Sequence, residues 1–347
     1  MTSGFKTRNL RSFGLTAALA ATAILPSLAQ KPFAVQDKWK IGGQGGWDYL
    51  AADPSAGRLY ITHGGRVEVI DAKTGKSIGA ITGLKGTHGV AFDAAGKYGY
   101  ISDGGANAVV VFDRTTLQTV TSIPAGTNPD GIAFEPVTKT VWAFNGRSKN
   151  VTVIDTATQK VIATVPLPGK PEFPVADGKG VIFDNIEDTS QIVRLDAKDP
   201  KVTATWSVSP CESPSGLAID REGRRLFTVC DGKKMAVVDA STGKVIATPA
   251  IGNGPDAAAY DAKNKLAFSS NGEGTVTIID ASDDSYKVLQ NLTTQAGART
   301  MTFDPATGKI YMVTAEFGPR PAPTDSNPRP RPAIVPDSFT VIVAGRE

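Results

Sequence analysis

One phrase recurs along this chain of 347 residues: a few small, apolar residues that end in an acidic residue, as in "GVAFD" and "DGIAFE". The acidic residues that end these phrases lie 40 to 43 positions apart along the chain. There are seven such anchors: Asp53, Asp93, Glu135, Asp177, Asp220, Asp261 and Asp304. A fixed period of this length is typical of repeat architectures, in which each unit buries its apolar face against its neighbours.

Each unit predicts four short strands. In the third unit "DGIAFE" is followed by "TVWAFN", "NVTVID" and "VIATVPL", which are rich in Val, Ile and Thr and separated by turn residues. No stretch has a helical apolar period over twelve or more residues. Seven four-stranded units predict an all-β, seven-bladed β-propeller. The Gly and Ala of the first strand suit the place where blades crowd the axis.

The two ends of the chain are expected to share the last blade. The seventh unit ends with its third strand, "SFTVIVAG" at 338–345, so it lacks a fourth. We expect 33–43 to supply that outer strand, because pairing the two ends removes a free sheet edge. The propeller is therefore expected to be a single domain over 30–347.

The first residues read as a secretory signal peptide. A basic stretch, "KTRNLRSFG", precedes the apolar "LTAALAATAILP" and the small residues "SLA", which predicts a signal over 1–29 with cleavage after Ala29. A retained membrane anchor is the alternative, but the apolar run is short for a span. We expect a periplasmic or secreted protein with no membrane span after cleavage.

Charge argues against a nucleic-acid partner. Three of the 37 basic residues lie in the signal, which leaves 34 against 34 acidic residues. A neutral mature chain has no overall attraction for phosphate backbones. We therefore expect a monomer that binds a small molecule or a protein.

Three stretches carry a family resemblance: "VEVIDAKTGKSIGAI", "VTVIDTATQKVIATVPL" and "MAVVDASTGKVIAT". They resemble the YVTN repeat, in which a strand ends in Asp, a Thr-Gly turn follows and a second strand returns. The mature chain resembles the secreted YncE-like family of seven-bladed propellers over all seven units. The resemblance implies the fold, whereas members and more distant propellers range from surface-layer and DNA-binding proteins to metal-dependent lactonases.

A polar ring is expected around one mouth of the channel. The start of each inner strand and the end of each second strand should lie there. The residues that open the inner strands are Asp48, His88, Asp130, Glu172, Ser215, Asp256 and Arg299. Those at the second-strand ends are His63, Asp103, Asn145, Asn185, Asp231, Asn271 and Glu316. A purely structural cap could be repeated unchanged, so their variation predicts a functional site.

The two histidines of the chain, His63 and His88, both fall in this ring. We expect them to lie close together on adjacent blades and, with Asp103, to bind a divalent metal. Imidazoles beside carboxylates suit metal binding or general acid–base chemistry near neutral pH. Ordinary turn histidines are the alternative.

Six other ring residues are expected to bind the ligand: Asp48, Asp130, Glu172, Asp256, Arg299 and Glu316. Asp130, Glu172 and Asp256, together with Asn145, Asn185 and Asn271, are oxygen donors of the kind that calcium or magnesium prefers. The alternative for each Asp and Asn is a cap that bonds neighbouring backbone amides.

Two further features are expected at the same mouth. Residues 316–336, a proline-rich insertion in the last unit with Arg320, Arg329 and Arg331, form either a lid that favours anions or a solvated loop. Cys211 and Cys230 flank two antiparallel strands, so we expect a disulfide that contributes about 3 kcal/mol. A free thiol or copper pair is the alternative.

These features predict a propeller that binds a ligand, a metal or a protein partner at its channel mouth. The one cofactor that they suggest is a divalent metal ion. The alternative is a metal-dependent hydrolase, lactonase-like, or a lyase that uses the ring acids and histidines. The chain has no GxSxG, HExxH or phosphate-loop motif, so we assign no catalytic residue.

Overall fold

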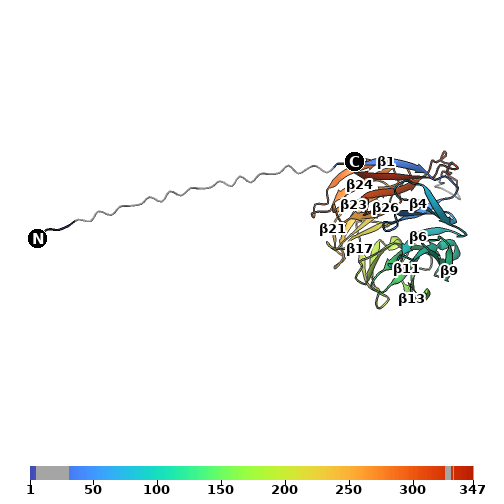
Figure 1. Cartoon of the computed structure of the whole chain (residues 1–347), viewed down its shortest axis with the longest axis horizontal. Helices are drawn as coiled ribbons and strands as arrows, with labels where there is room; N and C mark the ends of the chain where they lie inside the picture. Colours follow the sequence, from blue (N-terminus) through green and yellow to red (C-terminus); the bar gives the residue numbers. More distant parts are fainter. Residues whose placement is uncertain (5–30, 325–329, 331, 347) are drawn as a thin grey trace. The chain divides into compact units, whose positions relative to one another are not determined.

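The computed structural model describes residues 1–4, 31–324, 330 and 332–346. The chain divides into two units, 1–31 and 32–347. The first has no helix or strand among its described residues, and most of the predicted signal peptide lies outside the described ranges. The described residues of the second unit form seven four-stranded antiparallel sheets. Their inner strands contact one another in cyclic order, which makes a closed seven-bladed propeller (Figure 1).

Within each blade the strands follow one another outward from the axis. The inner strands are β2 (Trp47–Asp53), β6 (Thr87–Phe92), β10 (Pro129–Glu135), β14 (Pro171–Ala176), β18 (Leu217–Asp220), β22 (Pro255–Asp261) and β26 (Met301–Asp304). The second strands are β3 (Arg58–His63), β7 (Tyr98–Asp103), β11 (Thr140–Asn145), β15 (Val181–Ile186), β19 (Arg225–Cys230), β23 (Leu266–Asn271) and β27 (Lys309–Thr314).

The outer half of each blade carries two more strands. The third strands are β4 (Arg66–Asp71), β8 (Ala108–Asp113), β12 (Asn150–Asp155), β16 (Gln191–Asp196), β20 (Lys234–Asp239), β24 (Thr275–Asp280) and β28 (Thr340–Arg346). The outermost strands are β5 (Ser77–Ile81), β9 (Thr119–Pro124), β13 (Lys160–Pro166), β17 (Lys201–Ser207), β21 (Val245–Ala247), β25 (Val288–Thr293) and β1 (Phe33–Lys40). Two 3-10 turns, η1 (Gly104–Ala106) and η2 (Glu187–Thr189), complete the described elements, and no helix in the described ranges is long and apolar enough to cross a membrane.

The last blade is closed by both ends of the chain, as the sequence predicts. Strand β1 pairs antiparallel with β28, from Phe33 opposite Arg346 to Lys40 opposite Thr340, and in Figure 1 the blue β1 lies beside the dark-red C-terminal strands. The side-chain amide of Gln290 in blade 6 bonds both backbone groups of Phe33. Strand β1 therefore covers the outer edge of β28 and is itself tied to blade 6.

The core lies between the blades. Ile61 of blade 1 packs with Tyr311 and Val313 of blade 7, and Tyr60 of blade 1 packs with Phe112 of blade 2. Near the axis the blades are too close for larger residues, since a Cβ on Gly216 would lie 2.5 Å from the amide nitrogen of Ala258. This crowding is the physical reason for the small residues of the inner strands.

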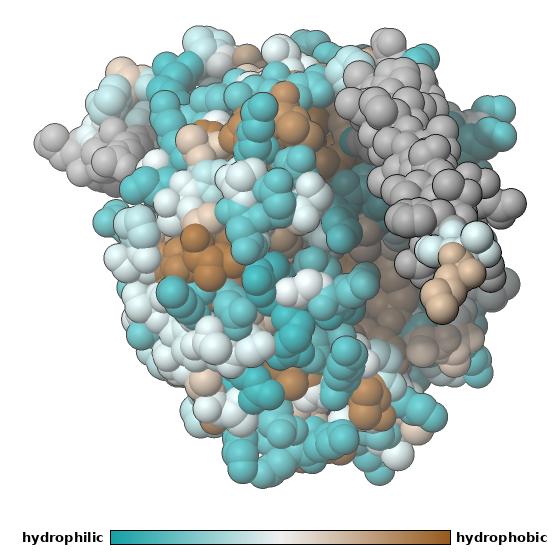
Figure 2. Space-filling model, turned by 90° about the vertical axis from the view of Figure 1, so that its left-hand side faces the viewer, coloured by the Kyte–Doolittle hydropathy of each residue, from teal (hydrophilic) through white to brown (hydrophobic). Residues whose placement is uncertain are grey.

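The face of the molecule drawn in Figure 2 is mostly hydrophilic. Figure 2 shows one face on which teal and white areas separate the brown ones. The exposed large apolar side chains of the propeller come mainly from the outermost strands and turns: Ile78, Val120, Val137, Val161, Ile162, Ile246, Leu289 and Phe317. Single exposed apolar residues are ordinary in a folded protein and need no partner.

The turn between the third and outermost strands explains the Asp-x-x-Thr pattern. Asp71 Oδ1 accepts hydrogen bonds from the amide and the hydroxyl of Thr74, both at 2.8 Å. The same Asp–Thr pair recurs in three other blades, at Asp113–Thr116, Asp155–Thr158 and Asp239–Thr242. Gly75 follows with a φ of +70°, and Trp39 of blade 7 packs where its Cβ would stand. The repeated residues therefore hold a turn.

Candidate functional site

The varying residues that open the inner strands lie in β-bulges. The pairing of inner and second strands shifts by one residue between Trp47 and Leu50 in blade 1, and at the same position in blades 2, 3, 4 and 6. A bulge inserts one residue and redirects its side chain. The residues placed in these bulges are Asp48, His88, Asp130, Glu172 and Asp256.

Side chains of the preceding blade hold three of the mouth residues in place. Ser102 donates its hydroxyl hydrogen to the carbonyl oxygen of Asp130 at 2.5 Å. Asn185 donates to the carbonyl oxygen of Ser215 at 2.8 Å, and the Ser270 hydroxyl bonds the carbonyl oxygen of Arg299. We did not predict these hydrogen bonds, although the sequence carries a signal for them: a polar residue lies one position before the end of the second strand.

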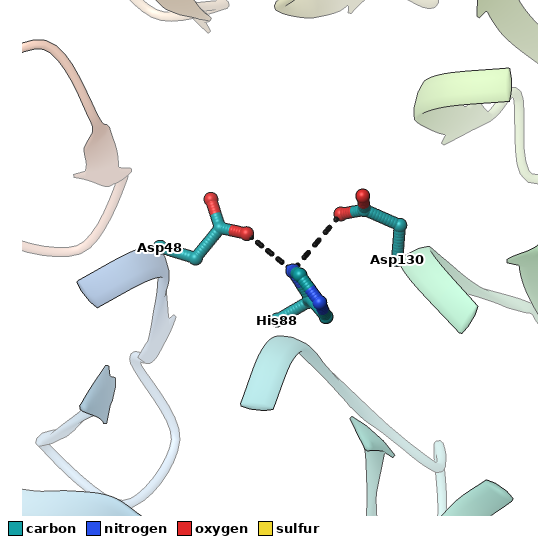
Figure 3. Close-up of side chains that lie close together, drawn as sticks. All are labelled: Asp48, His88 and Asp130. Atoms are coloured by element: carbon teal, nitrogen blue, oxygen red, sulfur yellow. Dashed lines mark hydrogen bonds and ion pairs between the residues drawn. The ribbon is translucent and has the colours of Figure 1, made fainter. Parts of the chain in front are cut away.

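Three mouth residues from adjacent blades converge on one point. His88 Nδ1 lies 2.6 Å from Asp48 Oδ2 and 3.5 Å from Asp130 Oδ1 (Figure 3). Possible ligand atoms of all three lie within 4.8 Å of one another. The side chains are 13 to 32 % exposed, so the group is half-buried yet open to solvent.

This arrangement shifts the pKa values of His88 and Asp130. Burial lowers the pKa of His88, but the hydrogen bond to Asp48 and the charge of Asp130 outweigh it, so the pKa is raised. Burial raises the pKa of Asp130 to about 6, against the opposing charge of His88. The imidazolium therefore only partly offsets the negative charge collected here.

The other half of the mouth pairs acids with bases. Lys170 Nζ lies 3.2 Å from Glu172 Oε2 and also bonds Glu187. Arg299 Nε lies 3.5 Å from Asp256 Oδ2. Burial, followed by the charge of Asp130, raises the pKa of Glu172 to about 8.

Two aromatic side chains, which we call the aromatic floor, meet across the channel next to these residues. The Tyr49 hydroxyl of blade 1 donates to the carbonyl oxygen of Glu172 in blade 4 at 3.1 Å, and the rings of Tyr49 and Phe173 lie 5.1 Å apart. Because blades 1 and 4 stand on opposite sides of a seven-membered ring, Tyr49 crosses the channel. The residues above it form a cup, which we call the mouth site: Asp48, His88, Asp130, Glu172, Ser215, Asp256 and Arg299.

We did not predict the floor, although the sequence carries a signal for it. The position after each mouth residue holds Gly, Ala or Thr in five blades. Only Tyr49 and Phe173 are aromatic there. An aromatic residue where the repeat otherwise keeps a small one marks a side chain that extends into the axis.

The structure does not bring His63 to His88. The His63 side chain is fully buried, stacks on Phe339 at 4.1 Å and has its Nδ1 3.9 Å from Glu68 Oε1. Neither ring nitrogen makes a hydrogen bond to any described residue. The expectation of a histidine pair fails because the side chain at the end of the second strand turns between blades and away from the axis.

The other residues expected at the second-strand ends also have local partners. The Asp103 carboxylate accepts the amides of Lys85 and Gly86 at 2.8 to 3.1 Å, so it caps a loop and lies outside the group formed by Asp48, His88 and Asp130. Asn145 donates to Asn150 and Thr152, and Asn271 donates to Thr275 and Thr277. The Asn residues are thus engaged in capping bonds.

The insertion at 316–336 is pinned at its base. The Glu316 amide donates to Ser338 Oγ at 2.9 Å and its carbonyl oxygen accepts the amide of Val335. Phe317 packs against Trp47, 6.2 Å between ring centroids, directly before Asp48. The Glu316 residue is exposed. Arg329 and Arg331, part of the proposed lid, lie outside the described residues.

The predicted disulfide is present. Cys211 and Cys230 are bonded, with Cα atoms 5.6 Å apart, and both are fully buried. It closes a loop of 19 residues in blade 5. It therefore anchors the segment that precedes the inner strand of that blade.

Comparison with known proteins establishes the fold alone. No known family model matches the chain, and no curated protein matches it significantly. Hydrazine synthase of Kuenenia stuttgartiensis is similar in structure, with a TM-score of 0.67 and 18 % identity over 77 % of this chain and 92 % of that chain.

Two further solved structures are similar over nearly their full length. U3-55K has a TM-score of 0.72 at 11 % identity, covering 91 % of this chain and 99 % of that one. The WD40 repeats of RRP9 have a TM-score of 0.75 at 12 % identity, covering 90 % and 98 %. These likenesses agree with the blades seen here, so the chain is a seven-bladed β-propeller.

Proposed function

We propose that this propeller binds a divalent cation at the mouth site through Asp48, His88 and Asp130. The observation that carries the proposal is the convergence of one imidazole nitrogen and two carboxylates from three blades within 4.8 Å. A mixed set of nitrogen and oxygen donors suits Zn²⁺ and Mn²⁺. A cation would also offset the negative charge that contributes to the raised pKa of Asp130.

The bound cation would present an open position to a ligand or protein partner at the mouth. Tyr49 and Phe173 lie across the channel next to the metal-binding residues, so a partner would approach from the other side, at the mouth. Lys170 and Arg299 flank the acids and would favour a partner that carries negative charge.

Calorimetric titration of the metal-free protein with Zn²⁺ and Mn²⁺ tests the proposal. We expect one equivalent of at least one of the two to bind, and His88→Ala and Asp130→Asn to abolish its binding. His63→Phe is the matched control, because His63 is buried against Phe339 and should leave binding unchanged. Binding that survives both mouth variants would refute the assignment.

A metal-assisted hydrolase or lyase is the second candidate. The pKa of Glu172, raised to about 8, is in the range that general acid–base catalysis near neutral pH requires. Turnover of model lactones and esters by the metal-loaded protein would favour this function if Glu172→Gln abolished turnover and left metal binding intact. Absence of turnover with full metal occupancy would favour binding alone.

We also propose that the chain is a YncE-like protein that works in the periplasm or outside the cell, as a monomer. The Asp–Thr turns in four blades and the buried disulfide support this, since disulfides persist in oxidising compartments. Expression of the whole chain in a bacterium should yield a periplasmic protein that begins at Gln30. A cytoplasmic protein with an intact N-terminus would contradict it.

A further inference from the structure

A groove lies between blades 5 and 6, on the face of the propeller where the inner strands end, opposite the mouth site. It measures about 290 Å³, close to the lower end of the range of about 300–1,000 Å³ that small-molecule sites occupy. Its lining comes from the loops that join the inner and second strands of both blades and from the turn between β24 and β25. None of its lining residues belongs to the mouth site, so it is a separate candidate site.

The turn on one side of the groove departs from the repeat. In blade 1 the amide of Asp71 bonds the carbonyl oxygen of Lys76, five positions on, whereas in blade 6 Asp280 bonds that of Lys287, seven positions on. The blade 6 turn is therefore longer and lacks the Asp-x-x-Thr pattern. It brings two acids and an aromatic residue into the lining of the groove: Asp283, Asp284 and Tyr286.

Two tyrosine rings form the apolar part of the lining. Tyr260 of β22 stacks on Phe227 with 5.2 Å between ring centroids, and Tyr286 meets the same ring at 6.3 Å. The Tyr286 residue is 4 % exposed, so packing fixes its position. Burial, followed by a hydrogen bond to Asp220, raises the pKa of Tyr260. Both rings therefore stay neutral, and aromatic faces attract ammonium groups.

The polar part of the lining is mainly acidic. Four carboxylates stand against two basic side chains: Asp220, Glu222, Asp283 and Asp284 against Arg225 and Lys265. Arg225 is already engaged, since it donates to the Asp239 carboxylate at 3.1 Å and to two carbonyl oxygens of its own loop.

The lining carboxylates remain available to a cation. None of the four forms a salt bridge with a basic residue in the described ranges. Glu222, Asp283 and Asp284 are exposed. An ionised carboxylate has about four acceptor positions, so the backbone amide that bonds Asp283 at 2.8 Å leaves room for an ammonium group.

We propose that this groove binds a linear polyamine. Among the described residues, the one group of three or more possible ligand residues within 4.8 Å of one another lies at the mouth, so the groove carboxylates do not converge on a point as metal ligands must. Carboxylates spread along a groove suit ammonium groups that short methylene chains hold apart. The rings of Tyr260 and Tyr286 would pack against those methylenes.

Calorimetric titration of the whole protein with spermidine at low ionic strength tests the proposal. We expect one equivalent to bind. Glu222→Gln and Asp284→Asn should each weaken binding about threefold, and about tenfold together, as the loss of exposed charge pairs predicts. Asp199→Asn is the matched control, because it removes an exposed carboxylate from the corresponding turn of blade 4, outside the groove, and should leave binding unchanged.

Competing cations separate a polyamine site from general attraction between charges. Ethylamine carries one ammonium group and should bind at least about tenfold more weakly than spermidine, and Mg²⁺ should displace spermidine no better than NaCl at equal ionic strength. Equal weakening by Asp199→Asn and the groove variants would overturn the inference, and so would tighter binding of a lysine-rich peptide, which would indicate a protein partner. Absence of binding heat, with a melting temperature unaffected by saturating spermidine, would also overturn it.

Discussion

Asp184 should make the protein more stable when it is replaced by valine. It lies on β15 of blade 4, is fully buried, and neither of its carboxylate oxygens makes a hydrogen bond to a described residue. Burial, then the charges of Glu172 and Asp130, raises its pKa well above the ordinary value and so favours the neutral acid. Four of the six other blades place an apolar residue at this register, namely Ile61, Ile101, Ala143 and Met312, and the other two place the uncharged Thr228 and Ser269 there.

The expected gain in unfolding free energy follows from the unsatisfied carboxyl group of Asp184. Relieving a buried, unpaired polar side chain is worth about 1–3 kcal/mol, and valine adds apolar contact in the interface between blades 3 and 4. We expect Asp184→Val to raise the free energy of unfolding by about 2 kcal/mol, or the melting temperature by about 3 °C for a domain of this size.

Urea denaturation of the disulfide-bonded protein measures this, with Asp184→Asn as the control. The amide has the same shape and stays unsatisfied, so it should give little gain. A loss of more than about 1 kcal/mol in Asp184→Val would mean that the carboxyl has a partner in the native protein, and the reasoning would be refuted.

Removing the disulfide by Cys211→Ser with Cys230→Ser should cost about 3 kcal/mol of unfolding free energy in denaturant titrations, since it releases a loop of 19 residues; an unchanged midpoint would contradict this. Stability should fall as pH rises from about 4 to 8, because the pKa values of Asp130 and Glu172 are raised in the folded state from 3.8 to about 6 and from 4.5 to about 8, so each contribution is lost as pH rises through the folded pKa. The slope in thermal melts should not exceed about 1.4 kcal/mol per pH unit for each group, and Glu172→Gln should make the fall shallower, because the raised pKa values of Asp130 and His88 still contribute to it. Trp39→Ala should destabilise by about 3–5 kcal/mol and open the ring at β1, which hydrogen exchange at 33–40 and 340–346 would report; slow exchange in both segments would show that Trp39 does not hold β1 in place.

The fold was predictable because the same four-strand pattern recurs in seven units of the sequence. A single unit could be misread, but an apolar strand ending in an acid at a steady period leaves little choice of architecture. The last unit of the sequence has only three strands of its own, so the same count predicted that the N-terminal segment supplies the fourth. Strand β1 is that fourth strand. The disulfide followed from two cysteines on neighbouring antiparallel strands.

The site was predictable only where the repeat itself positions it. Asp48, His88 and Asp130 occupy equivalent β-bulges in blades 1, 2 and 3. Placing one of these residues at the channel mouth therefore placed all three there. The direction of the His63 side chain depends on packing against Phe339 from the other end of the chain. The bond from Tyr49 to Glu172 spans 123 residues and the full width of the channel. Contacts of this kind depend on how the ring closes, which no local pattern encodes.

The most direct test of the account is an anomalous difference map from crystals soaked in Zn²⁺, recorded at the zinc absorption edge. The account predicts a peak about 2.0–2.2 Å from His88 Nδ1 and from carboxylate oxygens of Asp48 and Asp130, with the hydrogen bond between His88 and Asp48 replaced by two metal bonds. An empty mouth site at saturating Zn²⁺, with that hydrogen bond still at 2.6 Å, would contradict the account.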